Sequence, residues 1–531
     1  MGKKPVISSV KPTDKLKAKK KNKAKLLNKD LPKNKTAKKK NKKIGGGAGA
    51  AFAAGVAPAA AADGAVTNGA QPVPCGPADD SGAAAAAALR WVLAPTQTGP
   101  FFDSFWEKKP LLVQREKADY YGQLFSTAKL DSILRNENIQ FGRNLDVTSY
   151  SEGERETHNP AGRAHAPVVW DYYRNGCSVR LLNPQTYCGA VWRLCAALQE
   201  YFGCMVGANV YLTPPGTQGF APHYDDIEAF MLQLEGKKHW RIYAPRPGEE
   251  LARDSSGNFR PEDVTSPPVL DVTLKAGDLL YFPRGTIHQG RSLPDEHSMH
   301  ITISCYQHVA WADLLEKMVP VALQTAISED VEFRRGLPVG FLGHAGIVND
   351  ESTSTQRKEL LDTARRLVTR LADFLPVDAA VDQMGKQFMR DALPPCLSKD
   401  ERCRSVHEDG ERWADGAVRG QATMDGSTEI KLIRGNVVRL VNEGDELRLY
   451  HCLENSRLYQ EMPEQYLVIG DDEQADAVSV LLENYPRYTA IDLLPGTEPE
   501  AKVAFAAALW EKGMVVTRAP ITEEETDNAG S

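Results

Sequence analysis

The sequence lacks any long hydrophobic run. A long stretch without charged residues near the N-terminus, residues 45–62, is mostly Ala and Gly and lacks the Leu and Ile that a membrane-spanning helix needs. The first residues are rich in Lys and contain no apolar segment followed by a cleavage site, which argues against secretion. We therefore expect no membrane segment and no export.

Paired cysteine motifs are also absent. The nine cysteines are scattered and odd in number, and no CxxC pair indicates a structural zinc site or a redox couple. This pattern favours a reducing intracellular compartment.

Arginine and aromatic residues are missing from residues 1–43, whereas Lys is abundant there. Eighteen Lys stand against Asp14 and Asp30, a local balance of +16, so the net charge of −6 leaves −22 for the rest of the chain. We expect this basic tail to be disordered and to bind polyanions. It is either a solubilising extension or, as we favour, a nuclear and nucleolar address that holds the protein near RNA or DNA. Without Arg or aromatics, base-specific recognition is not expected.

The pattern of apolar and polar residues changes several times along the remaining 488 residues. In a chain of 531 residues this indicates more than one domain. Residues 44–88 form an Ala/Gly-rich linker, and order is expected from near Leu89. Residues 89–310 alternate short apolar runs with Gly/Pro turns, which predicts antiparallel strands closed into a barrel or double-sheet jelly roll. Helical periodicity marks residues 311–405, and residues 406–531 mix helices with short strands, as winged-helix modules do.

Two metal-ligand types lie close together in Pro222-His223-Tyr224-Asp225. On a strand, residues two apart project from the same face, so His223 and Asp225 are expected to reach one metal ion. His-x-Asp alone is a weak signal for a metal site, since such a pair usually lies in a surface loop or contains a histidine that only makes hydrogen bonds within the protein. The downstream segment of residues 276–288 reads as a turn, a buried strand, a second turn and His288. Two His and one carboxylate make the facial triad of Fe(II) oxygenases.

A lysine follows on a neighbouring strand. Gly236 is expected to make a turn between strands at residues 229–234 and 238–243. Lys238 and Trp240 are two residues apart on the second strand, so both side chains are expected to lie on the same face and to point inward. An inward lysine needs an anion. The anion is either a buried protein carboxylate or, as we favour, the far carboxylate of 2-oxoglutarate. Lys237, of opposite parity, should face solvent.

These motifs resemble the JmjC-domain ribosomal oxygenases, in particular members that combine lysine demethylase and histidyl-hydroxylase activities in the nucleolus. The resemblance runs from about Phe101 to the C-terminus, through residues 105–111, 176–185 and 209–243. It implies a mixed α/β fold with a mainly β catalytic core. That core is a JmjC/cupin double-stranded β-helix, followed by a helical dimerisation region and a winged-helix domain.

The resemblance also implies roles for individual residues. His223, Asp225 and His288 match the Fe(II) ligands and catalytic residues, and Lys238 matches the lysine that binds 2-oxoglutarate. Asn209, Tyr211 and His300 match positions that line the co-substrate pocket, and Arg180 and Ser304 match substrate-side positions.

The implied reaction consumes 2-oxoglutarate and O₂ and oxidises a C–H bond of a protein. The substrate is a histidine of a large-subunit ribosomal protein, which we favour, or methylated lysines 4 and 36 of histone H3; the sequence does not separate them. One alternative is a catalytically silent JmjC module that represses transcription on chromatin, which the complete triad and Lys238 argue against. Another is a plain cupin with a structural metal, which predicts no dependence on 2-oxoglutarate.

Partners follow from the same resemblance and from charge. A homodimer through residues 311–405 is implied. Acidic residues are frequent after Val406, which disfavours DNA binding by the winged-helix segment and favours a protein partner.

Overall fold

The computed structural model describes residues 80–408, 413–414, 416–418 and 423–521. The described residues form two compact units: a smaller one of residues 319–375, and a larger one of residues 80–318 with those from 376 onward. The basic tail at 1–43 and the linker up to residue 79 lie outside the described residues. No described helix is both long and apolar enough to cross a membrane.

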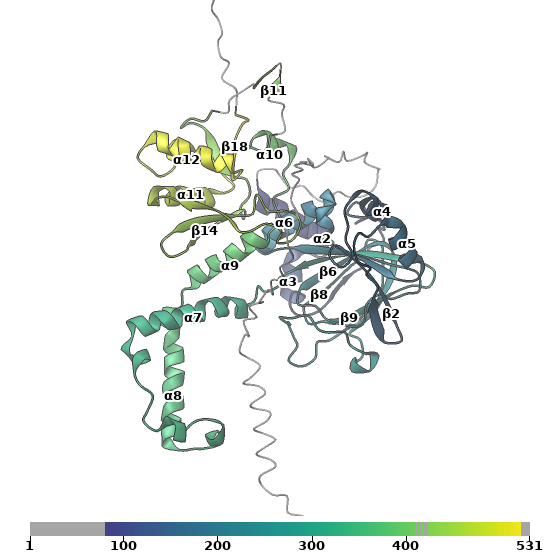
Figure 1. Cartoon of the computed structure of the whole chain (residues 1–531), viewed down its shortest axis with the longest axis horizontal. Coiled ribbons are helices and arrows are strands. Elements are labelled where there is room, and N and C mark those ends of the chain that lie inside the picture. The colour runs from purple at the N-terminus through teal and green to yellow at the C-terminus, as the bar shows by residue number, and fades with distance from the viewer. Residues whose placement is uncertain (1–79, 409–412, 415, 419–422, 522–531) are drawn as a thin grey trace, which may run out of the picture. The chain divides into compact units, whose positions relative to one another are not determined.

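A ten-stranded sheet, antiparallel at every pairing, forms the core of the N-terminal part of the larger unit (Figure 1). Its strands are β1 (Leu111–Val113), β2 (Leu145–Ser151), β3 (Glu154–Thr157), β4 (Ser178–Leu182), β5 (Gly207–Thr213), β6 (Glu228–Tyr243), β7 (Leu270–Lys275), β8 (Leu279–Phe282), β9 (Ile287–Ser292) and β10 (Ser298–Cys305). The order is β1-β8-β6-β10-β5-β4-β2-β3, with β7 and β9 also paired to β6. The long β6 is thus shared by two sets of strands, and the mainly β core predicted from sequence is confirmed.

Strand β6 passes straight through Gly236, so the predicted turn at this residue is wrong. Gly236 adopts φ +61°, and the register with β10 shifts between Met299 and His300. The shift leaves Leu234 without a partner on β10, and the glycine two residues further on, with its positive φ, lets the strand continue past this bulge. Any Cβ at Gly236 would lie 1.8 Å from the carbonyl oxygen of His297. One strand of 16 residues therefore replaces the two expected.

Helices cover the core. Helix α2 begins at Ser81, eight residues before the order expected at Leu89, because Asp80 caps Ala83 N–H and the Ala run has high helix propensity. Its buried side chains pack against α6 in the main hydrophobic core. The helices of this part are α2 (Ser81–Leu93), α3 (Thr98–Ser104), α4 (Thr127–Asn136), α5 (Ala166–Arg174) and α6 (Gly189–Phe202), with short 3₁₀ turns at Pro184–Thr186 and Pro261–Asp263.

The C-terminal part of the larger unit has its own hydrophobic core, in which Ile430, Leu449, Val478, Leu509 and Val515 are buried. Two three-stranded sheets and two main helices surround it, so the segment combines helices with short strands, as expected from the sequence. The elements are α9 (Val377–Asp391), α10 (Lys399–Cys403), β11 (Trp413–Ala414), β12 (Ala417–Val418), β13 (Glu429–Leu432), β14 (Val438–Asn442), β15 (Leu447–His451), β16 (Gln465–Ile469), α11 (Asp472–Asn484), β17 (Thr489–Ala490), a 3₁₀ turn (Ile491–Leu493), α12 (Pro499–Glu511) and β18 (Val515–Thr517).

The smaller unit is helical. Helix α7 (Trp311–Glu329) leads into it, and α8 (Thr355–Arg370) is its longest element, with 3₁₀ turns at Val331–Arg334, Phe341–Gly343, Ile347–Asn349 and Leu371–Phe374. None of the side chains of α8 is buried, and large apolar residues such as Val339 and Val368 are exposed. An ion pair of 2.9 Å between Arg370 and Asp330 ties α8 to the end of α7.

Candidate active site

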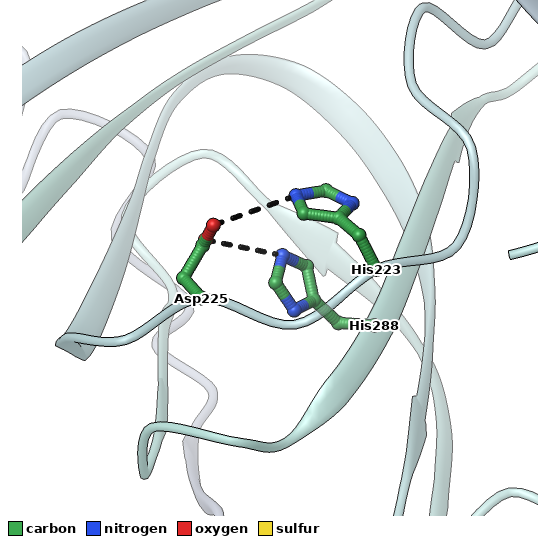
Figure 2. Close-up of side chains that lie close together, drawn as sticks. All are labelled: His223, Asp225 and His288. Carbon is green, nitrogen blue, oxygen red and sulfur yellow. Dashed lines mark ion pairs between the residues drawn. The ribbon is translucent and has the colours of Figure 1, made fainter. Parts of the chain in front are cut away.

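The structure brings His223, Asp225 and His288 together at one end of the β core. Their ligand atoms all lie within 4.8 Å of one another. Asp225 faces both imidazoles, with Oδ1 3.8 Å from Nε2 of His223 and Oδ2 3.7 Å from Nε2 of His288 (Figure 2). Two imidazoles and a carboxylate in this arrangement suit Fe(II) and leave coordination positions open.

The main chain fixes the separation of the two histidines. His223 N–H donates to the His288 carbonyl at 3.2 Å, and His288 N–H donates to the His223 carbonyl at 2.8 Å. The Gly285 N–H also donates to the Asp225 carbonyl at 2.9 Å. The expectation that His223 and Asp225 lie on a regular strand is wrong, because both lie in the loop before β6, where the bridge to His288 and the bond from Gly285 hold them. His288 lies at the start of β9, as predicted.

Hydrogen bonds also select the tautomer of both histidines. Nδ1 of His223 lies 2.8 Å from the Ala221 carbonyl, and Nδ1 of His288 lies 3.1 Å from the Thr286 carbonyl. A carbonyl only accepts, so Nδ1 carries the proton and the Nε2 lone pair faces Asp225. Burial, followed by the nearby His223, lowers the pKa of His288 to about 4. The ring of His288 therefore presents a neutral Nε2, which is what a metal ion requires.

Lys238 lies inside the barrel without a counter-charge. Its side chain is on the inner face of β6, and the residue is only 4% exposed. Nζ donates to Thr213 Oγ1 at 3.3 Å and lies 5.2 Å from the centre of the Trp240 ring. Among the described acidic side chains none forms an ion pair with it, so the alternative of a buried protein carboxylate is wrong. Burial lowers the pKa of Lys238 to about 7, as expected for an ammonium whose anion is supplied from outside.

Aromatic rings line the space between Lys238 and the three metal-ligand residues. Tyr211 stacks on His300 with ring centres 4.8 Å apart, and Trp240 meets His300 edge-on at 5.2 Å. His300 is 1% exposed and its Nδ1 has no hydrogen-bond partner in the structure. A buried, unpaired ring nitrogen beside a buried, unpaired ammonium fits a polar co-substrate.

A small cavity opens between these side chains, with a volume of about 30 Å³. A metal ion or a water molecule fits this volume. The lining residues are Tyr211, Phe220, Ala221, His223, Asp225, Met231, Lys238, Trp240, His288, Gln289, Gly290, His300 and Thr302.

Three predicted residues do not line this cavity. Asn209 lies on β5 opposite Thr302, and Ser304 lies on β10 near the far end of the strand. Arg180 lies on β4, opposite Tyr211, and donates from Nε to Asp146 at 3.1 Å. Their roles stay predictions.

Sequence reasoning missed Thr213, Phe220 and Thr302 as site residues. Strand parity could have found two of them, since Thr213 shares a face with Tyr211, and Thr302 shares a face with His300. Phe220 lies in a loop, where parity gives no signal.

Comparison with known proteins places the chain in a family. Residues 180–314 match the JmjC domain, and residues 393–521 match the C-terminal winged helix domain of ribosomal oxygenase 1. Ribosomal oxygenase 1 of Danio rerio is 50% identical over 438 residues, which cover 82% of this chain and 80% of that protein. A bifunctional lysine-specific demethylase and histidyl-hydroxylase of Branchiostoma floridae is 49% identical over 86% of this chain and 71% of its own length.

Among solved structures, the ribosomal oxygenase YcfD of Escherichia coli in complex with cobalt and 2-oxoglutarate is 15% identical. The alignment covers 80% of this chain and 99% of that one, with a TM-score of 0.39. The sequence relatives, the two domain matches and the metal-ligand geometry agree: the chain belongs to the ribosomal oxygenase 1 family of JmjC-domain, Fe(II)- and 2-oxoglutarate-dependent oxygenases.

Proposed function

We propose that this oxygenase hydroxylates a histidine side chain of a large-subunit ribosomal protein. The observation that carries the proposal is the metal-ligand triad beside the unpaired Lys238, in a chain 50% identical to a protein named ribosomal oxygenase 1. Fe(II) and 2-oxoglutarate supply the oxidising chemistry, in which O₂ is consumed, one oxygen atom enters the C–H bond and the other enters succinate, with release of CO₂.

The residues of the chain position the reactants. His223, Asp225 and His288 hold the metal through two neutral nitrogens and one carboxylate. Lys238 fixes the far carboxylate of 2-oxoglutarate, and Tyr211 and His300 close the pocket around it. Because Lys238, His288 and His300 are buried, this side of the pocket excludes water and its charge pairs form in a medium of low polarity.

Demethylation of lysines 4 and 36 of histone H3 is the second candidate. It is favoured by the names of relatives such as the Branchiostoma floridae protein, a lysine-specific demethylase as well as a histidyl-hydroxylase. Here an N-methyl carbon is oxidised, and the product loses formaldehyde. A silent chromatin-binding repressor module fits less well, because it gives no reason for a complete triad and an unpaired lysine.

Mass spectrometry decides between these functions. The full chain is incubated with Fe(II), 2-oxoglutarate and either a histidine-containing peptide of a large-subunit ribosomal protein or a trimethyl-lysine peptide of histone H3. We expect one added oxygen on histidine, lost in His223→Ala and retained in the control His344→Ala, whose histidine is in the smaller unit. Loss of methyl groups with formaldehyde would establish the demethylase instead. No change in either peptide would favour the binding module.

The location and partners are part of the proposal. The lysine-rich residues 1–43 are proposed to direct the protein to the nucleus and nucleolus and to contact polyanions there. Localisation of a fluorescent fusion, with and without these residues, tests this.

The smaller unit is proposed to carry a homodimer contact, supported by the exposure of Leu342 and Val368. Sedimentation showing a monomer would contradict it. The acidic C-terminal part is proposed to bind a protein rather than DNA, and DNA affinity of the full chain, lost when this part is deleted, would refute that.

A further inference from the structure

Two arginine side chains make cation–π contacts with one phenylalanine ring beside the metal-ligand residues. The guanidinium carbon of Arg155 lies 4.2 Å from the centre of the Phe220 ring, and that of Arg180 lies 5.5 Å from it. Phe220 itself lines the cavity, with its ring centre 6.3 Å from that of His223. Phe220 therefore joins a cationic cluster to the place where a substrate side chain must reach the metal.

Strand register puts the cluster on the inner face of the sheet. Asp146 on β2 is opposite Arg180 on β4, which is opposite Tyr211 on β5, which is opposite His300 on β10. Arg155 on β3 is opposite Tyr150, which has the parity of Asp146. Arg155 thus belongs to the row of side chains that leads to the co-substrate pocket.

The cluster contains more positive than negative charge. Its carboxylate, Asp146, accepts hydrogen bonds from Arg180 and, at 2.6 Å, from Asn159. Arg155 forms no ion pair with any described acidic side chain, and its Nε is buried without a hydrogen-bond partner. Burial, and then the charge of Arg180, lowers the pKa of Arg155 from its ordinary value. An unpaired, half-buried guanidinium opposes a second cation and has N–H groups to donate.

The aromatic rings of the cavity are also engaged. A quaternary ammonium is bound by free aromatic faces that form a cage. Here Phe220 already carries two guanidinium groups, Trp240 carries the Lys238 ammonium, and Tyr211 is stacked on His300. Among the described aromatic rings that line the cavity, each therefore has a cation or another ring against it.

We propose that Arg155, stacked on Phe220, sets the charge preference of the substrate entrance: it admits a neutral side chain that accepts a hydrogen bond and opposes a methylated lysine. The inference rests on the proposed function and deepens it, because it names the class of side chain that the oxygenase takes. A histidine is mostly neutral at pH 7 and offers an acceptor nitrogen. A trimethyl-lysine keeps its charge at every pH and offers no hydrogen bond.

Two peptides test this charge preference. Their sequences are identical except at one position, which is histidine in one peptide and trimethyl-lysine in the other. The sequence is that of the large-subunit ribosomal-protein peptide used above. Their dissociation constants are measured by fluorescence anisotropy on the full chain loaded with Mn(II) and 2-oxoglutarate, so that no turnover intervenes. We expect the wild-type protein to bind the histidine peptide roughly tenfold more tightly, as one nearby uncompensated charge in a partly buried site allows.

Three variants separate charge from structure. Arg155→Met removes the charge and the donors but keeps an apolar contact with Phe220, and should narrow the ratio to about threefold or less, mainly through tighter binding of the trimethyl-lysine peptide. Arg155→Lys keeps the charge and should keep the preference. Arg174→Met is the matched control, since Arg174 is an exposed arginine of α5 paired with Asp171, and should leave the ratio unchanged. If Arg155→Met folds poorly, Arg155→Gln makes the same test.

Each outcome supports or overturns the inference. A wild-type protein that binds both peptides equally, an unchanged ratio in Arg155→Met, or an equal loss for both peptides in that variant would overturn it. The proposed function fails separately, when the Fe(II)-loaded wild-type protein oxidises neither peptide, and the binding ratio still decides the role of Arg155 in that case.

Discussion

Two buried cations of the same barrel, Arg284 and Lys238, have opposite surroundings. Arg284, 6% exposed, forms ion pairs of 2.6 Å with Glu107 and 2.8 Å with the fully buried Glu228. Burial opposes its charge, but the two carboxylates outweigh burial and raise the pKa of Arg284. Lys238, 4% exposed, has no carboxylate within the described residues, and burial lowers its pKa to about 7. A neutralised cation supports the fold, whereas an unpaired one indicates where a charged ligand binds.

The largest effect on stability is expected at the neutralised cation. Arg284→Met leaves Glu228 buried without its partner, and breaking a buried pair in this way costs about 3–5 kcal/mol of unfolding free energy. Urea denaturation followed by tryptophan fluorescence measures this loss. A loss below about 1 kcal/mol would show that Arg284 and its ion pairs do not stabilise the fold.

Lys238→Met should show the reverse pattern. Unfolding free energy should stay unchanged or rise by about 1 kcal/mol, because an unpaired buried ammonium is removed. Binding of 2-oxoglutarate should weaken roughly hundredfold or more, since truncating one partner of a buried charge pair costs about 2–5 kcal/mol. Urea denaturation measures the unfolding free energy, and calorimetric titration of the Mn(II)-loaded protein with 2-oxoglutarate measures the binding. Unweakened binding would remove Lys238 from the co-substrate site.

The pH dependence of co-substrate binding sharpens the comparison further. The free protein holds Lys238 largely neutral above its pKa of about 7, so binding of the dianion must then take up a proton. The dissociation constant of 2-oxoglutarate should be flat below that pH and rise by up to about tenfold per pH unit above it. Titrations at several pH values, in buffers of different ionisation enthalpy, measure the proton uptake. Lys238→Met should abolish the dependence, and release of protons in the wild type would contradict it.

The smallest effect is expected for an exposed cation on the same strand as Lys238. Arg241 is on β6 with opposite parity, and its half-exposed side chain pairs with Asp271 at 3.2 Å. Arg241→Met should change unfolding free energy by less than about 1 kcal/mol and leave 2-oxoglutarate binding unchanged. Arg241→Met is the matched control for Arg284→Met and Lys238→Met. A large change in its unfolding free energy or its 2-oxoglutarate binding would mean that burial does not explain why the other two cations matter.

The difference between Arg284 and Lys238 also marks how far sequence reasoning reaches. The inward position of Lys238 follows from period-two parity, which needs only neighbouring residues. The partners of Arg284 come from Glu107 and Glu228, far apart in the chain, and no local pattern connects them. The same limit explains Gly236, where the sequence shows a flexible residue but not the partner strand, β10, on which Ser298 pairs with Gly236 so that β6 continues. It also explains Asp225, held in a loop by a contact from Gly285.

The exchange of main-chain hydrogen bonds between His223 and His288 separates folding from chemistry. The loop that carries His223 and the strand that carries His288 are joined by atoms that every residue type possesses, so either imidazole can be replaced without opening the barrel at this end. A descendant of this gene that lost one ligand would therefore inherit an intact scaffold with its peptide entrance still formed. Such a scaffold gives selection a direct route from an oxygenase to a pseudoenzyme that recognises the same partners without modifying them.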